Sequence, residues 1–549
     1  MGTYHTQTFT ITAALPYANG PIHIGHLAGA YLPADIYARY MRLRGHKVLF
    51  VCGSDEGGVA ILLRAKKEGI SPQEIIDHYH HQNKKDFSAL GISFDVFDRT
   101  SNPLHHKEAA AFFTKLYQDK KLEIATEEQL YDNVAKLFLA DRYLQGECPY
   151  CHFKEAYGDQ CESCGNTLSP TELIAPRSKL SGAPLVRKKT THWYFPLQNY
   201  AAWLKQWMVD NNTSWKSNVY GQCQSWLEAG LRRRSITRDL AWGIPVPLAA
   251  AKGKVLYVWF EAPIGYISAT KVWAKAHQKD WRTFWQDEKT QLVHFIGKDN
   301  IVFHAIIFPA MLKAHGGYIL PRHVVANEFM NLEGQKLSTS RNHAVWLKDY
   351  LATYPEKEDV LRYILCAQAP ETKDSNFRWE DYQTLNNQEL VGIVGNFAHR
   401  LGIFTAKYFQ SKIPQPSNFL PIDKAIIAQI SALPAQIGHA IENYKFKKGL
   451  AHLITFARLG NKYLADTAPW KKIKENPTRV STILYICLQI LAHFGFYGRP
   501  FLPFTSEKIS KIFGCTFGTW DDAYQFEKVP AGQPLSFGEM LFEKILAVR

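Results

Sequence analysis

The first fifty residues combine a strand, a turn, a helix and a second strand, and this order constrains the fold more than any other part of the chain. Phe9 to Leu15 and Val48 to Cys52 are apolar runs, and Pro16 to Pro21 form a turn before a helix that begins near His23. These are the parts of a βαβ unit of about thirty residues. The turn after its first strand lies over the carboxyl edge of a parallel sheet, where a helix start offers free N–H groups to an anion. The pattern therefore predicts a phosphate-binding turn.

Two short segments suggest that this phosphate belongs to ATP. The first is His23-Ile24-Gly25-His26, which follows the turn. The second is Lys336-Leu337-Ser338-Thr339-Ser340, about three hundred residues later. Taken alone, the two histidines could also be a metal pair or ordinary polar residues at a helix start. The sequence contains neither a Gly-x-Gly-x-x-Gly motif nor a Walker-type loop. This argues against a dinucleotide dehydrogenase and a P-loop ATPase.

Size and charge narrow the class of protein. A chain of 549 residues with 46% hydrophobic residues is expected to form several globular domains. By inspection, no apolar run approaches the length of a transmembrane helix, and the N-terminus lacks the order of a signal peptide. With 64 Lys and Arg against 50 Asp and Glu, the net charge is +14. This favours a polyanionic partner, with nucleic acid as the leading candidate.

The pattern of the sequence changes along the chain. Residues 1–119 alternate strands and helices, as a parallel α/β sheet does. Residues 120–235 have irregular spacing and a cysteine cluster, which predicts an inserted domain. A second α/β block follows, in which Lys254 to Trp259 and Gln291 to Ile296 are predicted strands. From residue 386 to 549 the composition is helical, and the 3.6-residue period of its apolar positions predicts a bundle.

Four of the nine cysteines lie close together, as Cys148-Pro-Tyr-Cys151 and Cys161-Glu-Ser-Cys164. Four thiolates at this spacing match the tetrahedral preference of zinc, and a site whose four positions are all filled by protein is structural. Iron is the minor competitor for the same ligand set. Two disulfides or a redox pair are the alternatives. Both are disfavoured because the other cysteines are scattered and no signal peptide is visible, which indicates a reducing cytoplasm.

Taken together, these motifs resemble the class I aminoacyl-tRNA synthetases, whose two signatures are a His-x-Gly-His stretch and a Lys-Met-Ser-Lys-Ser loop. Within that class the sequence is similar to the methionyl-tRNA synthetase family. The matching stretches, besides the cysteine pairs, are Leu15 to Gly20, Tyr257 to Tyr266, His294 to Asp299 and Ala468 to Trp470. The resemblance implies an α/β fold with a split Rossmann-type parallel sheet (1–119 and 236–325) and an inserted zinc-knuckle domain (120–235). It also implies a stem-contact region at 326–385, with the loop at 336–340, and an α-helical anticodon-binding domain at 386–549.

The resemblance also implies the reaction. Methionine and ATP give methionyl-adenylate and pyrophosphate, and methionine then passes to the terminal adenosine of tRNA(Met). Attack of the carboxylate on the α-phosphorus builds negative charge on oxygen, so the site needs positioned donors more than a nucleophile. His23 and His26 can donate from the helix start, and Lys336 can clamp the pyrophosphate. The remaining ATP-binding residues that the family implies are Asn19, Gly25, Gly297 and Asp299, and Mg²⁺ is expected with the phosphates.

A methionine pocket must be apolar and narrow, with weak donors for the thioether sulfur. By resemblance, the Leu15 N–H and the Tyr266 hydroxyl face the sulfur, and Asp55 binds the ammonium. The other implied lining residues are Tyr17, Trp259, Ala262, Pro263 and His304. Ordinary core packing is the alternative for each aromatic residue. Class I enzymes for leucine, isoleucine or valine carry a large editing domain, for which an insert of roughly 115 residues has no room. Cysteinyl enzymes hold their zinc in the catalytic half, without a double knuckle.

Two positions depart from the family pattern. Thr339 stands where the family loop has its second lysine, and Arg341 is a hypothetical substitute for that charge. Gly57 stands where relatives often carry histidine, whereas Asp55 is retained.

The helical region is expected to read the anticodon through Asn396, Arg400 and Trp470. Arginine and asparagine can hydrogen-bond unpaired base edges while tryptophan stacks on a base. A surface arginine and a helix-cap tryptophan are the alternatives. Because the chain ends just after the bundle, without the oligonucleotide-binding domain that dimerises some family members, we expect a monomer without a membrane partner.

Two other functions stay open at this point. One is a class I nucleotidyltransferase that makes a small cofactor, although such enzymes are shorter and lack the knuckles and the bundle. The other is a catalytically inactive zinc-ribbon protein that binds RNA, which only Thr339 supports. Intact His23, His26 and Lys336 count against it.

Overall fold

A five-stranded sheet forms the centre of the molecule. The computed structural model describes residues 6–547 apart from 140–142, 159–160, 162, 165–167, 169, 212–214, 339–341, 517 and 521–524. All neighbouring strands of the central sheet are parallel, in the order β14-β13-β1-β2-β3. The strands are β1 (Thr8–Ala13), β2 (Lys47–Ser54), β3 (Val96–Arg99), β13 (Gln291–Gly297) and β14 (Pro321–Asn327). The predicted split parallel sheet is therefore confirmed, with β1 to β3 from the first α/β block and β13 and β14 from the second.

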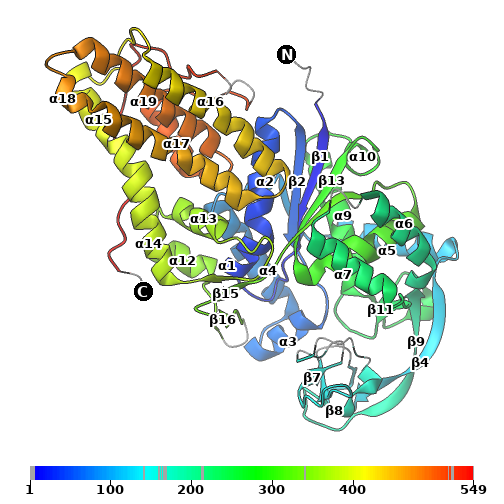
Figure 1. The fold of residues 1–549 in the computed structure, drawn as a ribbon. Helices are drawn as coiled ribbons and strands as arrows, with labels where there is room; N and C mark the ends of the chain where they lie inside the picture. The colour runs from blue at the N-terminus through cyan, green and yellow to red at the C-terminus, as the bar shows by residue number, and fades with distance from the viewer. Residues whose placement is uncertain are drawn as a thin grey trace.

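Helices cover both faces of this sheet, which explains why its strands are apolar along their whole length. Helix α2 (Leu32–Leu43) packs on one face, where Ile11 and Ile36 share a core cluster. On the other face lie α5 (Pro103–Gln118) and α9 (Ile264–Ala276), where Val51 and Ile267 share a second cluster. Figure 1 shows the sheet between these two layers.

The predicted βαβ unit is present and begins as expected. A turn leads from β1 into the short helix α1 (Ile24–His26), which continues through a π-helical turn (Leu27–Tyr31) into α2 and returns through β2. Residues after β2 run into α3 (Val59–Glu68) and α4 (Pro72–Ala89). The loops after β1 and β2 therefore lie at the same edge of the sheet.

The strand predicted for Lys254 to Trp259 is wrong for most of its length. Only β12 (Val255–Leu256) is a strand, and it pairs with β11 (Thr237–Arg238) outside the central sheet. The chain then forms the helix α8 (Val258–Glu261). Periodicity does not separate a short apolar run in a strand from one turn of buried helix, and this ambiguity caused the error.

The insert stands on a long antiparallel ribbon made by β4 (Glu123–Asp132) and β9 (Val186–Phe195). Figure 1 shows this ribbon reaching away from the sheet, with the cysteine-rich segment at its end. That segment has its own small sheet of β6 (Leu144–Glu147), β7 (Ala156–Tyr157) and β8 (Ile174–Ser178). The helices α6 (Ala201–Asn211) and α7 (Ser217–Glu228) return the chain to the core.

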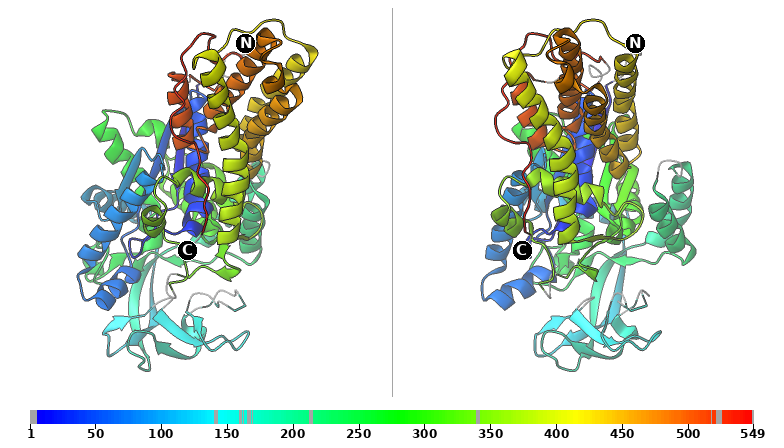
Figure 2. Two further views of the ribbon diagram at one scale, coloured as in Figure 1. Left: turned by 90° about the vertical axis from the view of Figure 1, so that its left-hand side faces the viewer. Right: turned by 60° about the vertical axis from the view of Figure 1, so that its left-hand side comes forward.

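Between the sheet and the bundle lies a small mixed region. Its strands are β15 (Met330–Leu332), β16 (Gln335–Lys336) and β17 (Ser375–Phe377), and its helices are α12 (Leu347–Thr353), α13 (Glu358–Ala367) and α14 (Trp379–Leu385). The bundle that follows consists of a π-helical segment (Asn386–Gly395), α15 (Asn396–Phe409), α16 (Pro421–Glu442), α17 (Phe446–Thr467), α18 (Pro469–Lys472), α19 (Pro477–Gly498) and α20 (Pro503–Phe513). Figure 2 shows the long helices side by side, which confirms the predicted bundle.

Helix α19 corrects the expectation that no run approaches transmembrane length. Among the described residues it is the one helix that is long and apolar enough to cross a membrane, with a mean hydropathy of 1.5. Most of its apolar stretch is buried inside the bundle. A buried core helix has the same composition, so the helix alone is weak support for a membrane span.

Candidate active site and metal centre

The two histidines after β1 cap the same helix start. His23 is the N-cap residue of α1, and its Nδ1 accepts the backbone N–H groups of Gly25 and His26 at 3.1 and 3.3 Å. In return, His26 Nδ1 accepts the backbone N–H of His23 at 3.2 Å. The two rings stack with centroids 3.6 Å apart. The pair is a capping box built from imidazoles, in which two backbone donors and one reciprocal donor are satisfied.

This geometry fixes the protonation of both rings. Because each Nδ1 accepts a backbone proton, a neutral ring must carry its own proton on Nε2. Burial and the neighbouring His26 lower the pKa of His23 to about 2, and burial lowers the pKa of His26 to about 4. Near neutral pH both side chains are therefore neutral Nε2–H donors next to a helix start, as the phosphate site requires.

The second signature lies directly beside this turn. The backbone of His23 bridges to Trp346, and the Ile24 N–H donates to the Val345 carbonyl at 3.1 Å. A Cβ at Gly25 would lie 2.6 Å from Leu337 Cδ1, so a larger residue there would displace the leucine side chain from the turn. Lys336 precedes that leucine and is exposed, with its ammonium 5.8 Å from the centre of the Phe329 ring. The structure thus brings Lys336 to the histidine turn, while Thr339 and Arg341 lie outside the described residues.

The expected ribose residues end a neighbouring strand. Gly297 closes β13, which pairs with β1, and an added Cβ at Gly297 would lie 2.6 Å from Asp299 Oδ1. Asn19 is half-buried in the turn after β1. Strand order reverses between β1 and β13, which is the kind of switch point where open α/β sheets bind ligands. The predicted ATP residues therefore share one edge of the sheet.

The residues predicted to bind methionine gather next to this edge. The rings of Tyr17 and Trp259 meet edge to face with centroids 6.2 Å apart, and Trp259 stacks on Phe303 at 3.9 Å. Ala262 and Pro263 follow Trp259 and are buried. They form an apolar, aromatic environment of the kind that a thioether requires.

Two predicted sulfur donors are hydrogen-bonded to protein. The Tyr266 hydroxyl lies 2.9 Å from His304 Nε2, and His304 Nδ1 lies 3.1 Å from the Asn300 carbonyl. Because a carbonyl only accepts, His304 carries its proton on Nδ1 and receives the tyrosine proton on Nε2. The Leu15 N–H bonds to the Tyr266 hydroxyl. Their role toward a sulfur atom stays a prediction.

Asp55 is buried in the loop after β2, which pairs with the Tyr17 turn through a backbone bridge. Its Oδ1 accepts the Gly57 N–H at 3.2 Å. Burial and the nearby Glu261 raise the pKa of Asp55 well above its usual range. A bound cation would favour the ionised form of this carboxyl, which burial and Glu261 disfavour in the empty site.

The structure adds residues to the site that the sequence had not singled out. They are Phe303 against Trp259, Trp346 against the histidine turn, and Glu261 with His105 behind Asp55. Glu261 lies inside the Tyr257 to Tyr266 stretch, which is the one signal that could have identified it. The others are brought in by long-range packing.

The four clustered cysteines converge as predicted. The sulfur atoms of Cys148, Cys151, Cys161 and Cys164 all lie within 4.8 Å of one another. The pairs Cys148–Cys164 and Cys151–Cys161 are 3.9 and 3.6 Å apart, which excludes a disulfide in either. A tetrahedron of zinc–sulfur bonds of about 2.3 Å has edges of about 3.8 Å. The residues therefore fit a tetrahedral metal ion, zinc first.

Loss of this metal is expected to unfold the insert's small sheet. In Cys161→Ser we expect zinc content to fall from about one ion per chain to a small fraction, because three thiolates bind the ion far more weakly. Hydrogen exchange of residues 144–178 should then become faster. Colorimetric zinc release and hydrogen exchange measure both effects. Cys223→Ser, at a buried cysteine outside the cluster, is the matched control and should keep its zinc.

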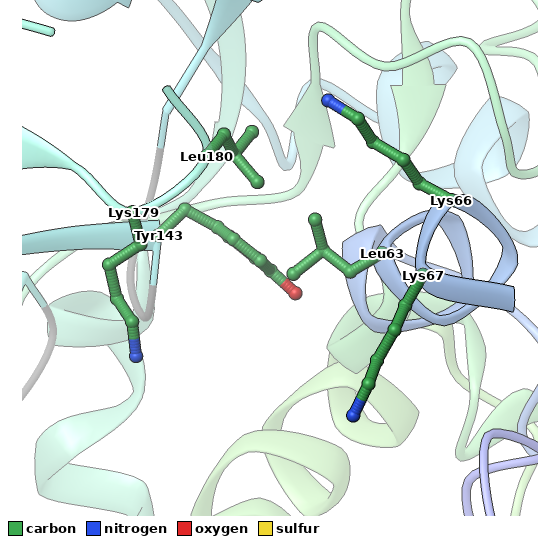
Figure 3. A pocket seen from close by; sticks show the side chains of 6 residues that line it. All are labelled: Leu63, Lys66, Lys67, Tyr143, Lys179 and Leu180. Atoms are coloured by element: carbon green, nitrogen blue, oxygen red, sulfur yellow. The ribbon is translucent and has the colours of Figure 1, made fainter. Parts of the chain in front are cut away.

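A basic cleft separates α3 from the insert. Its volume is about 410 Å³, and Figure 3 shows Lys66 and Lys67 on one side and Tyr143 with Lys179 on the other. Leu63 and Leu180 complete the lining. Lys179 lies within 3.2 Å of the Tyr157 hydroxyl. Exposed ammonium groups around apolar and aromatic side chains are typical of a surface that binds single-stranded nucleic acid.

Two of the three predicted anticodon residues meet in the bundle. The Arg400 guanidinium lies over the Trp470 ring, 5.1 Å from its centre, and Trp470 is 45% exposed. Asn396 is exposed at the start of α15, one turn before Arg400. Figure 1 shows α18, which carries Trp470, at the end of the bundle remote from the sheet. An exposed indole beside a guanidinium can stack on an unpaired base.

Comparison with known proteins finds relatives along nearly the whole chain. The family model described as tRNA synthetases class I (M) matches residues 9–402, and that described as anticodon binding domain of methionyl tRNA ligase matches residues 413–548. The methionine–tRNA ligase of Cytophaga hutchinsonii is 56% identical over 98% of this chain and 79% of that protein. Its counterpart in Bacteroides fragilis is 54% identical over 98% of this chain and 78% of that protein.

Solved structures agree with the fold. A Mycobacterium tuberculosis methionyl-tRNA synthetase in complex with methionyl-adenylate has a TM-score of 0.82 and 22% identity, covering 98% of this chain and all of the other. The apo form of the M. tuberculosis protein has a TM-score of 0.75 at 22% identity, covering 100% of both chains. At this identity the match describes the architecture alone.

Proposed function

The chain belongs to the class I tRNA synthetases of the methionyl type, and from this we propose how its own residues ligate methionine to tRNA. The observation that carries the proposal is the meeting of the histidine turn, Lys336 and the cluster of Asp55, Tyr17 and Trp259 at one edge of the sheet. The enzyme activates methionine with ATP and transfers it to the terminal adenosine of tRNA(Met).

In the first step, the neutral rings of His23 and His26 donate Nε2–H to the phosphoryl oxygens as negative charge builds there. Lys336 stands on the β15–β16 hairpin and binds the departing pyrophosphate. Gly297 and Asp299 hold the ribose, and Asn19 and Gly25 line the nucleotide. Mg²⁺ bound to the phosphates would neutralise part of their charge beside these residues. Since the contribution of Thr339 is smaller than that of lysine, Arg341 is proposed to supply part of the missing charge.

Methionine lies between Tyr17 and Trp259, with its ammonium on Asp55. Ala262 and Pro263 shape the apolar wall, and His304 holds the Tyr266 side chain in place by accepting its hydroxyl proton. The buried carboxyl of Asp55 supplies the charge that fixes the amino group, while the aromatic rings select a long apolar side chain.

For the second step, tRNA binds at both ends of the molecule. The anticodon is read by Asn396, Arg400 and Trp470, and the single-stranded end passes through the basic cleft to the adenylate. The cleft begins on α3, which follows the Asp55 loop by a few residues, so this path leads into the site. Zinc holds the insert that forms the other wall. A monomer in the cytoplasm is proposed, without a membrane partner.

The deciding experiment is amino-acid-dependent exchange of pyrophosphate into ATP. We expect exchange with methionine alone among the twenty amino acids. Exchange with leucine or cysteine but not methionine, or no exchange at all, would contradict the proposal.

The basic cleft makes a separate prediction. In Lys66→Ala/Lys67→Ala we expect the KM for tRNA to rise about tenfold and the salt dependence of binding to weaken by a slope of about 1.4, because two phosphate contacts to a single strand are lost. Pyrophosphate exchange without tRNA should keep its rate. Lys120→Ala/Lys121→Ala, at an exposed lysine pair after α5, is the matched control. Equal effects in both variants would show that the cleft is not the path.

A further inference from the structure

A second buried carboxylate lies behind Asp55. Glu261 closes α8 and is 2% exposed. Its Oε2 lies 2.8 Å from His105 Nε2 on α5. Its Oε1 faces the Asp55 loop, since a Cβ at Gly57 would lie 2.7 Å from it. Gly57 also donates its N–H to Asp55 Oδ1. The two carboxyl groups therefore both lie against Gly57, and the absence of a side chain at this position allows the approach of Glu261.

The hydrogen bonds around Glu261 are compatible with two protonation states of the Glu261–His105 pair. Ser268 Oγ lies 3.1 Å from the Gly265 carbonyl and 2.9 Å from His105 Nδ1. If the Ser268 hydroxyl donates to the Gly265 carbonyl, His105 donates its Nδ1 proton to the Ser268 oxygen. A second proton must then lie between His105 Nε2 and the Glu261 carboxyl to make their hydrogen bond. If the hydroxyl proton goes to Nδ1, His105 donates from Nε2 to an ionised Glu261. The two arrangements differ by one proton and need no movement beyond rotation of a hydroxyl.

Among the described residues, no lysine or arginine neutralises this pair of carboxyls. The third acid of the region, Glu56, is paired with Arg99 at 2.8 Å. In the described part of the chain, neither Asp55 nor Glu261 has a lysine or arginine within ion-pair distance. Burial raises the pKa of both carboxyls well above their usual range, and each is raised further by a neighbouring acid. The titratable groups that face Glu261 and His105 are Asp55 and Glu56 from the loop after β2, Asp98 from β3, and His106 and Glu108 from α5.

We propose that Glu261, fixed by His105, is a positioning residue that acts on the methionine ammonium through Asp55. In the empty site, Asp55 and the Glu261–His105 pair share a proton, and entry of the ammonium expels that proton to solvent. The ammonium then faces an ionised Asp55 that is backed by a second negative charge. This inference rests on the proposed function, because it requires that methionine binds at Asp55.

The proton release can be measured directly. Isothermal titration of methionine at pH 7, in buffers of different ionisation enthalpy, gives the number of protons released. We expect release in the wild type and at most half as much in Glu261→Gln, in which Asp55 already ionises in the empty site. The same variant should bind methionine about tenfold more weakly, the equivalent of one pKa unit. Glu261→Asp keeps the charge and should retain the proton release.

An amine-free analogue separates charge from folding. 4-(Methylsulfanyl)butanoate has the methionine side chain and carboxylate but no ammonium, and Trp259 fluorescence reports its binding. Glu261→Gln should leave the affinity for this analogue unchanged or improve it, whereas a merely structural defect would weaken both ligands. Gly57→Ala, which displaces Oε1, should act in the same direction as Glu261→Gln.

Two outcomes would overturn the inference: equal proton release in wild type and Glu261→Gln, or equal loss of affinity for methionine and the analogue. A wild-type chain that binds no methionine would instead contradict the proposed function. The two failures are therefore distinguishable.

Discussion

A chain in which His23 is replaced by asparagine is expected to keep its fold and lose about 10²- to 10³-fold in the rate of adenylate formation. Asparagine is among the best N-cap residues, so it can still accept the backbone N–H groups that His23 Nδ1 accepts. It cannot place a donor where the imidazole Nε2–H lies. Rapid-quench measurement of adenylate formation, with thermal unfolding in parallel, tests both halves of this expectation.

His23→Ala is the matched variant, because it removes the cap as well as the donor. It should lose the same rate and about 1 kcal/mol of stability besides. If His23→Asn reacted at the wild-type rate, the turn would serve only to start the helix.

The pH dependence follows from the lowered pKa of each ring. Both values, about 2 and about 4, lie below the ordinary 6.5, so the folded protein keeps the rings neutral in solutions where the unfolded chain binds protons. Stability from these two groups is therefore complete above about pH 6.5 and is lost as the pH falls toward the folded pKa. The rate of adenylate formation should show no step near 6.5 from these rings. A step that disappears in His23→Asn would contradict this assignment.

Local sequence patterns could predict the parts of the site that depend on neighbouring residues. The turn after β1, the capped helix and the cysteine knuckles are set by residue types within a few positions of one another, so they follow from local rules. The split sheet could also be predicted, since apolar runs before glycine and proline turns recur on either side of the insert. The short run Lys254 to Trp259 could not, because the pattern of a buried helical turn there equals that of a strand.

The remaining parts of the site depend on contacts that no local pattern contains. His105 and Glu261 are 156 residues apart in sequence, and Gly25 meets Leu337 across most of the chain. The resemblance implies that Gly25 binds ATP, but only the structure shows that Leu337 packs against this glycine. Such contacts form when the elements pack around the completed sheet, and the pattern of a single sequence does not predict them.

Arg362→Met is expected to lower the free energy of unfolding by about 3–5 kcal/mol, the largest effect on stability that we predict. Arg362 on α13 and Asp35 on α2 are both 0% exposed at their side chains and lie 2.7 Å apart. The same guanidinium donates to the carbonyl groups of Pro500 and Phe501 between α19 and α20, at 3.0 and 2.9 Å. Methionine fills the volume but leaves these buried acceptors without their donors.

Arg39→Met is the control that removes a positive charge from Asp35 and leaves the contacts of Arg362 with Pro500 and Phe501 in place. Arg39 also contacts Asp35, at 2.9 Å, but its side chain is partly exposed and its guanidinium donates to the Gly91 carbonyl. Its loss should cost about 1 kcal/mol.

Burial alone would raise the pKa of Asp35, but Arg39 and Arg362 lower it to about 2, so this pair stabilises the fold above about pH 4 and less as the pH falls. Arg362→Met should reduce that acid-dependent loss of stability, which urea unfolding at several pH values measures.

The location of Arg362 also predicts which step of the reaction suffers. Helix α2 continues the histidine turn, and the Pro500 segment belongs to the bundle that carries Trp470, so one guanidinium joins the proposed adenylate site to the bundle. Below the unfolding temperature, Arg362→Met should keep pyrophosphate exchange near the wild-type rate, because the sheet edge is intact. Aminoacylation should slow, because it requires both ends of tRNA to be engaged at a fixed separation. Equal loss in both assays would mean that Arg362 supports the catalytic fold itself and does not set the position of the bundle.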